Sequence, residues 1–300
     1  MTANDRMNMN PMLLIFQTIF LREHNRICAE LHQRNPHWDD DRLFETTRLI
    51  VLIMWLKVGF ETYINGLNGT CYQLSIKAFE KIQQKAFSIA MHRPPLEYEL
   101  AYVWHGLIPD DITIGNEIKP FDYYFNQPQH FLEHSIDAWV DSLSKQPCGL
   151  QTMNNNPAYL LHVDMAKLQL TRDLGMATLN DYRKQLGFSL HQTFADITSN
   201  KDIQQKLKNL YHHVDKVEFY PGIYAEQPVT GFKGTVMTAI IGTNALLNLA
   251  IHPLLNKHVC NAENLTVYGM ELVNNSSLRD IIWRNTKTKP TVVFHTELPI

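Results

Sequence analysis

Apolar residues recur with helical spacing along most of the chain, and this pattern predicts a mainly α-helical fold. The longest periodic stretch covers residues 43–67. The acids of Asp39-Asp-Asp41 before it are typical of a helix start, and Asn65-Gly66 and Asn68-Gly69 are typical of a helix end. Pro94-Pro95 separates it from a helix that ends at Pro109. Further helices are predicted at residues 79–90, 131–143, 160–174, 177–186, 203–213 and 235–249.

A few segments depart from this pattern. Residues 112–118 partly alternate apolar and polar side chains, which predicts a short hairpin, and residues 291–294 predict a short strand. The apolar run 11–21 is too short to span a bilayer. Residues 234–256 carry no acid or base except His252 but contain three asparagines, so we expect a buried helix there and not a membrane span. Since no repeat or linker marks a boundary, residues 1–300 are predicted to form a single helical domain.

Composition narrows the function classes. The chain is 45% hydrophobic and 19% charged, an ordinary balance for a globular protein. A net charge of −3 without a basic tract argues against a nucleic-acid partner. The four cysteines are scattered without CxxC spacing, which argues against a zinc site and against a disulfide-dense scaffold.

The candidate chemistry lies in the run Tyr102-Val-Trp-His105. On a helix, a spacing of three would place Tyr102 and His105 on one face, about one turn apart. A neutral imidazole can hold a haem iron, and a phenol one turn away could lose an electron and become a hydrogen-abstracting tyrosyl radical. Taken alone, a helical histidine beside aromatic residues is more often a core residue, so the pattern needs support from elsewhere in the chain.

A resemblance to segments of a known family supplies that support. The segment Leu21-Arg-Glu-His-Asn-Arg26 resembles the REHNR segment of the animal haem peroxidases, and Tyr102-Val-Trp-His105 resembles the proximal-histidine segment of the cyclooxygenases (prostaglandin H synthases). Residues 181–184, 218–222 and 285–288 also resemble cyclooxygenase segments, in the same order. The resemblance runs from about residue 11 to about residue 294. It implies a partial haem peroxidase-like helical catalytic domain.

The resemblance implies roles for individual residues. His105 matches the proximal ligand of the haem b iron, and Tyr102 matches the radical-forming catalytic tyrosine. The resemblance implies that further residues support the radical or the substrate. Tyr63 matches a tyrosine that hydrogen-bonds the radical tyrosine, Trp104 belongs to the same segment as His105, and Tyr220 matches a tyrosine that can share the radical. The residues that match the channel wall are Ile64, Leu67, Ile241, Gly242 and Leu247. Without the resemblance, core packing would be the default role of these residues. The implied reaction joins a polyunsaturated fatty acid and O2 into a hydroperoxide or endoperoxide, with a peroxide as the peroxidase substrate.

Several positions depart from the family pattern. Thr70 stands where cyclooxygenases have a tyrosine that helps to hold the substrate carboxylate, and Leu246 stands where they have the serine that aspirin acetylates. Trp283 and Lys289 occupy the two positions of a family disulfide, which therefore cannot form here. These departures leave two alternatives open: a linear fatty-acid dioxygenase of the same superfamily, or an inactive truncated pseudoenzyme without haem.

The family's distal histidine lies upstream of the REHNR segment, whereas the first histidine here is His24 within it. We therefore expect a chain that lacks the N-terminal part of the domain, including the distal histidine and the membrane-binding segment, and a slow peroxidase, because a proton-moving group contributes roughly 10²–10⁴-fold. His24 is expected to be structural. Family analogy further suggests a homodimer and a lumenal endoplasmic-reticulum membrane surface.

Overall fold

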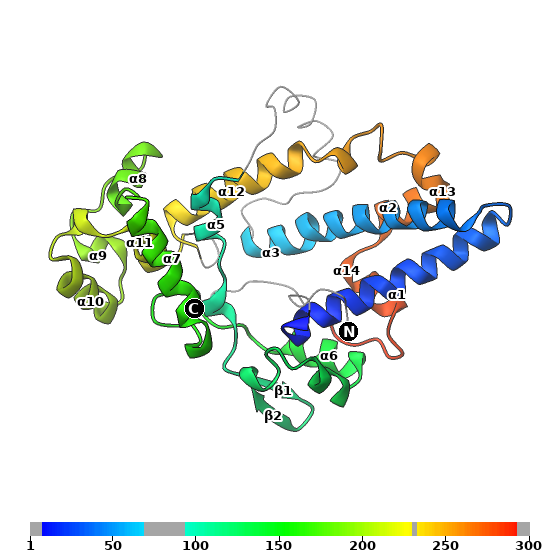
Figure 1. Ribbon diagram of the computed structural model, residues 1–300, viewed down its shortest axis with the longest axis horizontal. Coiled ribbons are helices and arrows are strands. Elements are labelled where there is room, and N and C mark those ends of the chain that lie inside the picture. Colours follow the sequence, from blue (N-terminus) through cyan, green and yellow to red (C-terminus); the bar gives the residue numbers. More distant parts are fainter. Residues whose placement is uncertain (1–7, 69–93, 230–232, 293–300) are drawn as a thin grey trace. The chain divides into compact units, whose positions relative to one another are not determined.

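The computed structural model describes residues 8–68, 94–229 and 233–292, and within these it is mainly helical (Figure 1). The predicted mainly α fold is therefore confirmed. The larger helices are α1 (Pro11–Arg34), α2 (Asp40–Val58), α6 (Ile136–Lys145), α7 (Leu161–Asp173), α10 (Lys201–Tyr211), α12 (Thr235–Ala250) and α13 (Ala262–Asn275). The shorter ones are α3 (Asn65–Asn68), α5 (Leu96–Ala101), α8 (Leu179–Gln185), α9 (Phe194–Ile197), α11 (Phe219–Ala225) and α14 (Leu278–Arg284).

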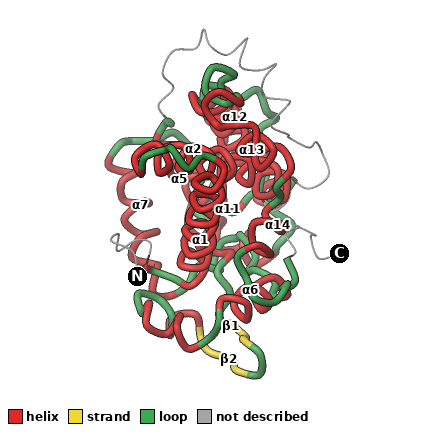
Figure 2. The backbone as a smooth tube through the Cα atoms, turned by 90° about the vertical axis from the view of Figure 1, so that its right-hand side faces the viewer, coloured by secondary structure: helices red, strands yellow, loops and turns green. Residues whose placement is uncertain are grey.

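One antiparallel hairpin interrupts the helices (Figure 2). Its strands are β1 (Asp111–Ile114) and β2 (Glu117–Pro120), and Ile114 pairs with Glu117 across a tight turn. Gly115 in that turn has a positive φ of 61°, a conformation that glycine adopts without steric cost. The hairpin predicted at residues 112–118 is thus confirmed.

The described chain forms two compact units, and each draws on separate stretches of the sequence. Among the described residues, unit 1 comprises residues 8–68, 111–147 and 249–292, and unit 2 comprises residues 94–110, 148–229 and 233–248. The expectation of a single domain stays a prediction.

Unit 1 is built on two long helices. Asn10 accepts a hydrogen bond from the Leu13 amide and caps α1, while Asp39 caps α2 by accepting from the Arg42 amide. α1 and α2 pack against each other, α13 packs on α2, and α14 packs on α1 (Figure 1). The inner faces of α1 and α2 carry fully buried aliphatic side chains, among them Ile19, Ile27, Leu31, Ile50 and Ile53.

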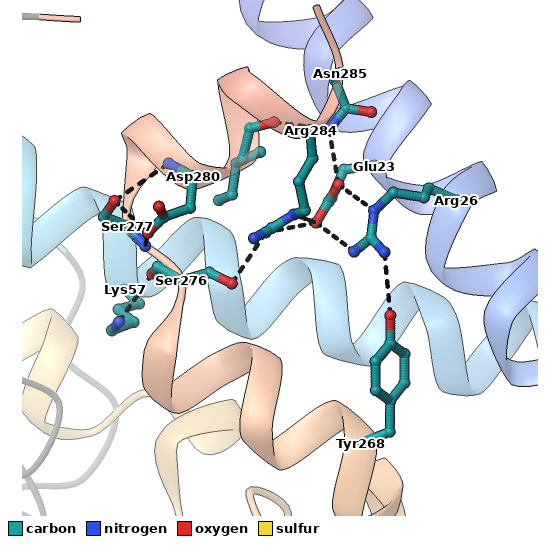
Figure 3. A network of polar contacts seen from close by, with 10 residues as sticks. Glu23, Arg26, Lys57, Tyr268, Ser276, Ser277, Asp280, Arg284 and Asn285 are labelled. Atoms are coloured by element: carbon teal, nitrogen blue, oxygen red, sulfur yellow. Dashed lines mark hydrogen bonds and ion pairs between the residues drawn. The ribbon is translucent and has the colours of Figure 1, made fainter. Parts of the chain in front are cut away.

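A buried carboxylate joins α1 to α14 within unit 1 (Figure 3). Glu23 is completely buried and accepts hydrogen bonds from Arg26 on its own helix and from Arg284 and Asn285 at the end of α14. Arg26 extends the network to α13 through the Tyr268 hydroxyl, 3.1 Å from its Nη1. The REHNR segment therefore has a structural role here, since its glutamate links two helices that are about 260 residues apart in sequence.

Unit 2 packs α5, α8, α10 and α11 around a core that includes Leu179, Leu207, Phe219 and Ile223. The first turn of α12 is anchored to this core by Glu226, whose Oε2 accepts from the Val236 amide at 2.9 Å. The same carboxylate pairs with Arg183 and lies 3.2 Å from His191 Nε2.

Most predicted helices are confirmed. The stretch 43–67 is helical throughout, as α2, a π-helix (Gly59–Ile64) and α3, and helices also lie over 160–174, 177–186, 203–213 and 235–249. The helix predicted at 131–143 begins only at Ile136, because a 3-10 helix (Pro128–Glu133) precedes it. The helix predicted at 79–90 lies outside the described residues. Residues 291 and 292 are not strand, and the rest of the predicted C-terminal strand is outside them too.

Among the described α-helices, the sequence pattern left five unpredicted, namely α1, α9, α11, α13 and α14. α12, which covers most of the apolar segment 234–256, buries Val236, Met237, Ile240 and Ile241 in its first half, whereas residues 242–249 apart from Asn244 are partly or fully exposed, so the predicted buried helix is confirmed only in part. Among the described helices, none has the length and hydropathy needed to cross a membrane.

Candidate functional site

Tyr102 and His105 do not share a helix, so the predicted placement on one helical face is wrong. α5 ends at Ala101, and Tyr102 has non-helical angles of φ −90° and ψ 59°. His105 opens a separate 3-10 turn, His105–Leu107. The helix ends because tertiary partners satisfy its last carbonyl groups: the Tyr224 hydroxyl donates to the Leu100 carbonyl oxygen at 2.8 Å.

A loop from later in the chain fixes the backbone around His105. Gln151 Nε2 donates to the Val103 carbonyl at 2.9 Å, Asn155 Nδ2 donates to the Gly106 carbonyl at 3.0 Å, and the Gly149 amide donates to the Leu107 carbonyl at 2.9 Å. Gly149 lies so close to the Gly106 carbonyl that a Cβ at position 149 would overlap it. The position of the His105 segment is therefore set by contacts some 45 residues away in sequence.

The imidazole of His105 is paired with a carboxylate. His105 Nδ1 lies 3.3 Å from Asp164 Oδ2, in the first turn of α7, and both side chains are largely buried, with exposed fractions of 21% and 14%. Asn156 Nδ2 donates to the same oxygen at 2.8 Å, and the Tyr220 hydroxyl donates to Asp164 Oδ1 at 2.7 Å. Burial alone would raise the pKa of Asp164, but the hydrogen bonds from His105, Tyr220 and Asn156 outweigh it and hold the pKa below its ordinary value.

Two tyrosines of α11 face this pair. Tyr220 and Tyr224 are four residues apart on one helical face, and their rings meet edge to face with centroids 5.2 Å apart. Burial, the neighbouring Tyr224 and the Asp164 carboxylate raise the pKa of Tyr220 far above its usual value. Both phenols therefore stay protonated at neutral pH.

Tyr102 stacks in an aromatic row. Its ring lies 5.3 Å from that of Tyr98 in a stacked arrangement and 4.9 Å from that of Trp104. All three side chains pack against the apolar core of unit 2. Tyr102, Trp104, His105 and Tyr220 thus all belong to unit 2.

The other predicted site residues have different surroundings. Tyr63 and Ile64 lie in the π-helix of unit 1 and Leu67 lies in α3, so their predicted role beside Tyr102 stays a prediction. Ile241, Gly242, Leu246 and Leu247 follow one another along α12. Thr70 lies outside the described residues.

The two residues that replace the family disulfide, Trp283 and Lys289, contact each other in the structure. Lys289 Nζ lies 5.3 Å from the centre of the Trp283 ring, within cation–π range. The two positions matched to a family disulfide are therefore neighbours here, joined by a non-covalent contact. His24 packs its ring 5.5 Å from that of Phe44, in keeping with a structural role.

Sequence reasoning missed three polar residues of the site, Asp164, Asn156 and Gln151. Asp164 fell within a correctly predicted helix, but nothing in the local sequence connects it to a histidine 59 residues earlier. The available signal was a single acidic residue in the first turn of a helix that carries both polar and apolar residues. Such an acid usually only interacts favourably with the helix dipole.

Comparison with known proteins identifies the family to which the chain belongs. A family profile described as animal haem peroxidase matches residues 1–295. The chain belongs to the animal haem peroxidase family. The predicted resemblance to cyclooxygenases is confirmed: prostaglandin G/H synthase 1 of Rattus norvegicus is 32% identical over 288 residues, covering 95% of this chain and 47% of that protein. Prostaglandin G/H synthase 2 of Gallus gallus is 32% identical over 299 residues, covering 96% and 48%. The chain thus spans about half the length of the curated relatives it matches.

Solved structures share the fold. A fatty acid alpha-dioxygenase of Oryza sativa has a TM-score of 0.78 at 17% identity, covering 96% of this chain and 59% of that one. Peroxidase A of Dictyostelium discoideum has a TM-score of 0.70 at 22% identity, covering 97% and 58%. These likenesses concern the fold, and they agree with the predicted haem peroxidase-like architecture.

Membership of this family implies a haem group, and the donors around His105 fit one. The porphyrin supplies four ligands to its iron, so a single imidazole suffices from the protein side. Nδ1 of His105 is engaged by Asp164, so Nε2 would be the nitrogen available to a metal ion. Across the described residues, no group of three or more His, Cys, Asp or Glu side chains is placed to hold a metal ion by itself.

Proposed function

We propose that the chain forms part of a haem-dependent fatty-acid dioxygenase and peroxidase that resembles the prostaglandin G/H synthases. The observation that carries the proposal is the largely buried pair of His105 and Asp164, in which Asp164 also accepts a hydrogen bond from Tyr220. His105 follows Tyr102 by three residues. The similarity to prostaglandin G/H synthases along nearly the whole chain supports it. The substrates would be a polyunsaturated fatty acid, O2 and a peroxide, and the lumenal membrane surface and the homodimer remain parts of the proposal.

Each residue of the site would have a separate role in the reaction. His105 would hold the iron of haem b through Nε2. Haem supplies oxidising power when bound. Tyr102, after losing one electron to the oxidised haem and its phenolic proton to water, would take a hydrogen atom from an unreactive C–H bond of the fatty acid and so regain its O–H. Tyr220, protonated and hydrogen-bonded to Asp164, would be the second redox-active phenol.

A linear fatty-acid dioxygenase is the second candidate. Thr70 and Leu246, which replace a carboxylate-holding tyrosine and a channel serine, favour it, since both changes alter where a fatty acid would be held. Analysis of the products formed from a polyunsaturated fatty acid separates a cyclic endoperoxide from a linear hydroperoxide.

Haem reconstitution of the purified chain is the first test. The parent should give a Soret band, and His105→Ala should abolish it, because the iron loses its protein ligand. His24→Ala, outside the cluster, should bind haem as the parent does. Equal haem binding by His105→Ala and the parent would refute the ligand assignment, and a parent without haem would favour the pseudoenzyme alternative.

Oxygen uptake tests the role of Tyr102 in a form of the protein that oxygenates fatty acids. Tyr102→Phe should remove oxygenation and leave peroxide-driven dye oxidation largely intact, since phenylalanine has no O–H to oxidise. Tyr63→Phe should be milder, because it removes one hydrogen bond of about 1 kcal/mol. Retained oxygenation in Tyr102→Phe would move the radical elsewhere, with Tyr220 as the next candidate.

A further inference from the structure

Asp164 is the point where three polar side chains from separate parts of unit 2 converge. Its Oδ2 faces His105 Nδ1 at 3.3 Å and accepts from Asn156 Nδ2 at 2.8 Å, while its Oδ1 accepts from the Tyr220 hydroxyl at 2.7 Å. His105 and Tyr220 lie 59 and 56 residues from Asp164 in sequence. Only the tertiary fold brings these groups together, so the convergence is not a by-product of local helix geometry.

The contact restricts the imidazole. A neutral histidine carries one N–H, and an ionised carboxylate can only accept hydrogen bonds. A neutral His105 in this contact therefore carries its hydrogen on Nδ1 and donates it to Asp164, which leaves the lone pair on Nε2. Tyr220 and Asn156 hold the carboxylate from two other directions, so it cannot easily turn away from the ring.

We propose that Asp164 is a positioning residue, which fixes His105 in the Nδ1–H form, directs Nε2 to the haem iron and strengthens electron donation from the imidazole. The proposal rests on the proposed function above. A hydrogen bond from a ligand imidazole to a carboxylate makes the ligand more basic. The iron–imidazole bond should then be stronger and the oxidised iron favoured over the reduced form. An amide at position 164 would keep the shape of the side chain but remove its charge.

The first experiment reads the histidine tautomer in the haem-free chain by nitrogen NMR of labelled histidine, at about pH 8, where free imidazole is neutral. The parent should show His105 as the Nδ1–H form, and Asp164→Asn should reduce that preference. Asp173→Asn is the matched control, since Asp173 is exposed on the same helix and accepts a hydrogen bond from Gln169 at 2.7 Å. A parent His105 in the Nε2–H form would overturn the proposal, and this reading needs no substitution to fold.

The second experiment reads the reconstituted chain. In Asp164→Asn the resonance Raman frequency of the ferrous iron–histidine stretch should fall, the midpoint potential should rise, and haem affinity should weaken by roughly 10–100-fold, as is usual when the partner of a ligand histidine is lost. Asp173→Asn should match the parent in all three. An unchanged stretching frequency in Asp164→Asn would overturn the proposal.

The two proposals fail in different ways. If His105→Ala binds haem as tightly as the parent, the proposed ligand and function fail, while the tautomer measurement still decides whether Asp164 orients His105. If His105→Ala loses haem but Asp164→Asn is indistinguishable from Asp173→Asn, the proposed function stands and the role of Asp164 falls.

Discussion

The sharpest stability test is to neutralise the buried carboxylate of Glu23 by Glu23→Gln. Five hydrogen bonds end on its two oxygens: two from Arg26 at 2.9 Å each, two from Arg284 at 3.1 and 2.8 Å, and one from Asn285 at 2.7 Å (Figure 3). Glutamine fits the space but carries no charge and presents an amide group to the guanidinium groups. Two cations would then be left facing each other without the anion between them.

The size of the effect follows from burial. Removing one partner of a buried ion pair costs about 3–5 kcal/mol. Because the Arg26 and Arg284 side chains keep exposed fractions of 27% and 28%, water can partly solvate them, and we expect the lower end of that range, about 3 kcal/mol. That is a large share of a typical unfolding free energy of about 5–15 kcal/mol.

Urea unfolding of the parent and of Glu23→Gln measures this loss. Glu30→Gln on the same helix is the control, since Glu30 makes one ion pair with Arg34 at 3.8 Å between half-exposed side chains and should contribute less than about 1 kcal/mol. Equal unfolding free energies for the Glu23 and Glu30 variants would refute the reasoning, because they would mean that the network does not stabilise unit 1.

The pH dependence should follow the same carboxylate. Burial alone would raise the pKa of Glu23, but the hydrogen bonds from Arg26, Arg284 and Asn285 lower it overall. Its stabilisation is therefore fully present above the unfolded-state pKa of about 4.3 and is lost as the pH falls through the lower folded-state value. The difference in unfolding free energy between the parent and Glu23→Gln should be constant at neutral pH and shrink in acid.

Two further substitutions test the frame around His105. Gly149→Ala should weaken haem binding strongly, because its Cβ would overlap the Gly106 carbonyl, whereas Gly59→Ala, with open space at its Cβ, should bind haem normally; equal haem affinities would contradict the tight contact. Tyr224→Phe removes the donor to the Leu100 carbonyl at the end of α5 and should cost about 1 kcal/mol in thermal or urea unfolding, with a loss near zero arguing that the bond is not formed in solution.

The sequence by itself determined the helical architecture and the family. Apolar periodicity located α7, α8 and α10, because a surface helix must present one apolar face to a core wherever that core lies, and the long uncharged apolar run located α12. The hairpin at residues 112–118 was also legible, since strand alternation and a turn glycine are local features. The ordered motifs around His24, His105 and Tyr220 identified the family without any coordinates.

Only the tertiary structure decided how the site is built. Local spacing predicted a continuous helix through Tyr102 and His105. In the structure, the Tyr224 hydroxyl donates a hydrogen bond to a backbone carbonyl of α5, and the side-chain amide of Gln151 donates to a carbonyl of the segment that follows. The partner of His105 could not be predicted either, because a carboxylate 59 residues away does not affect the local sequence pattern around the histidine. Periodicity reports which face of an element is buried, whereas the polar contacts that end a helix or orient a ligand depend on which distant groups the fold brings within hydrogen-bonding distance.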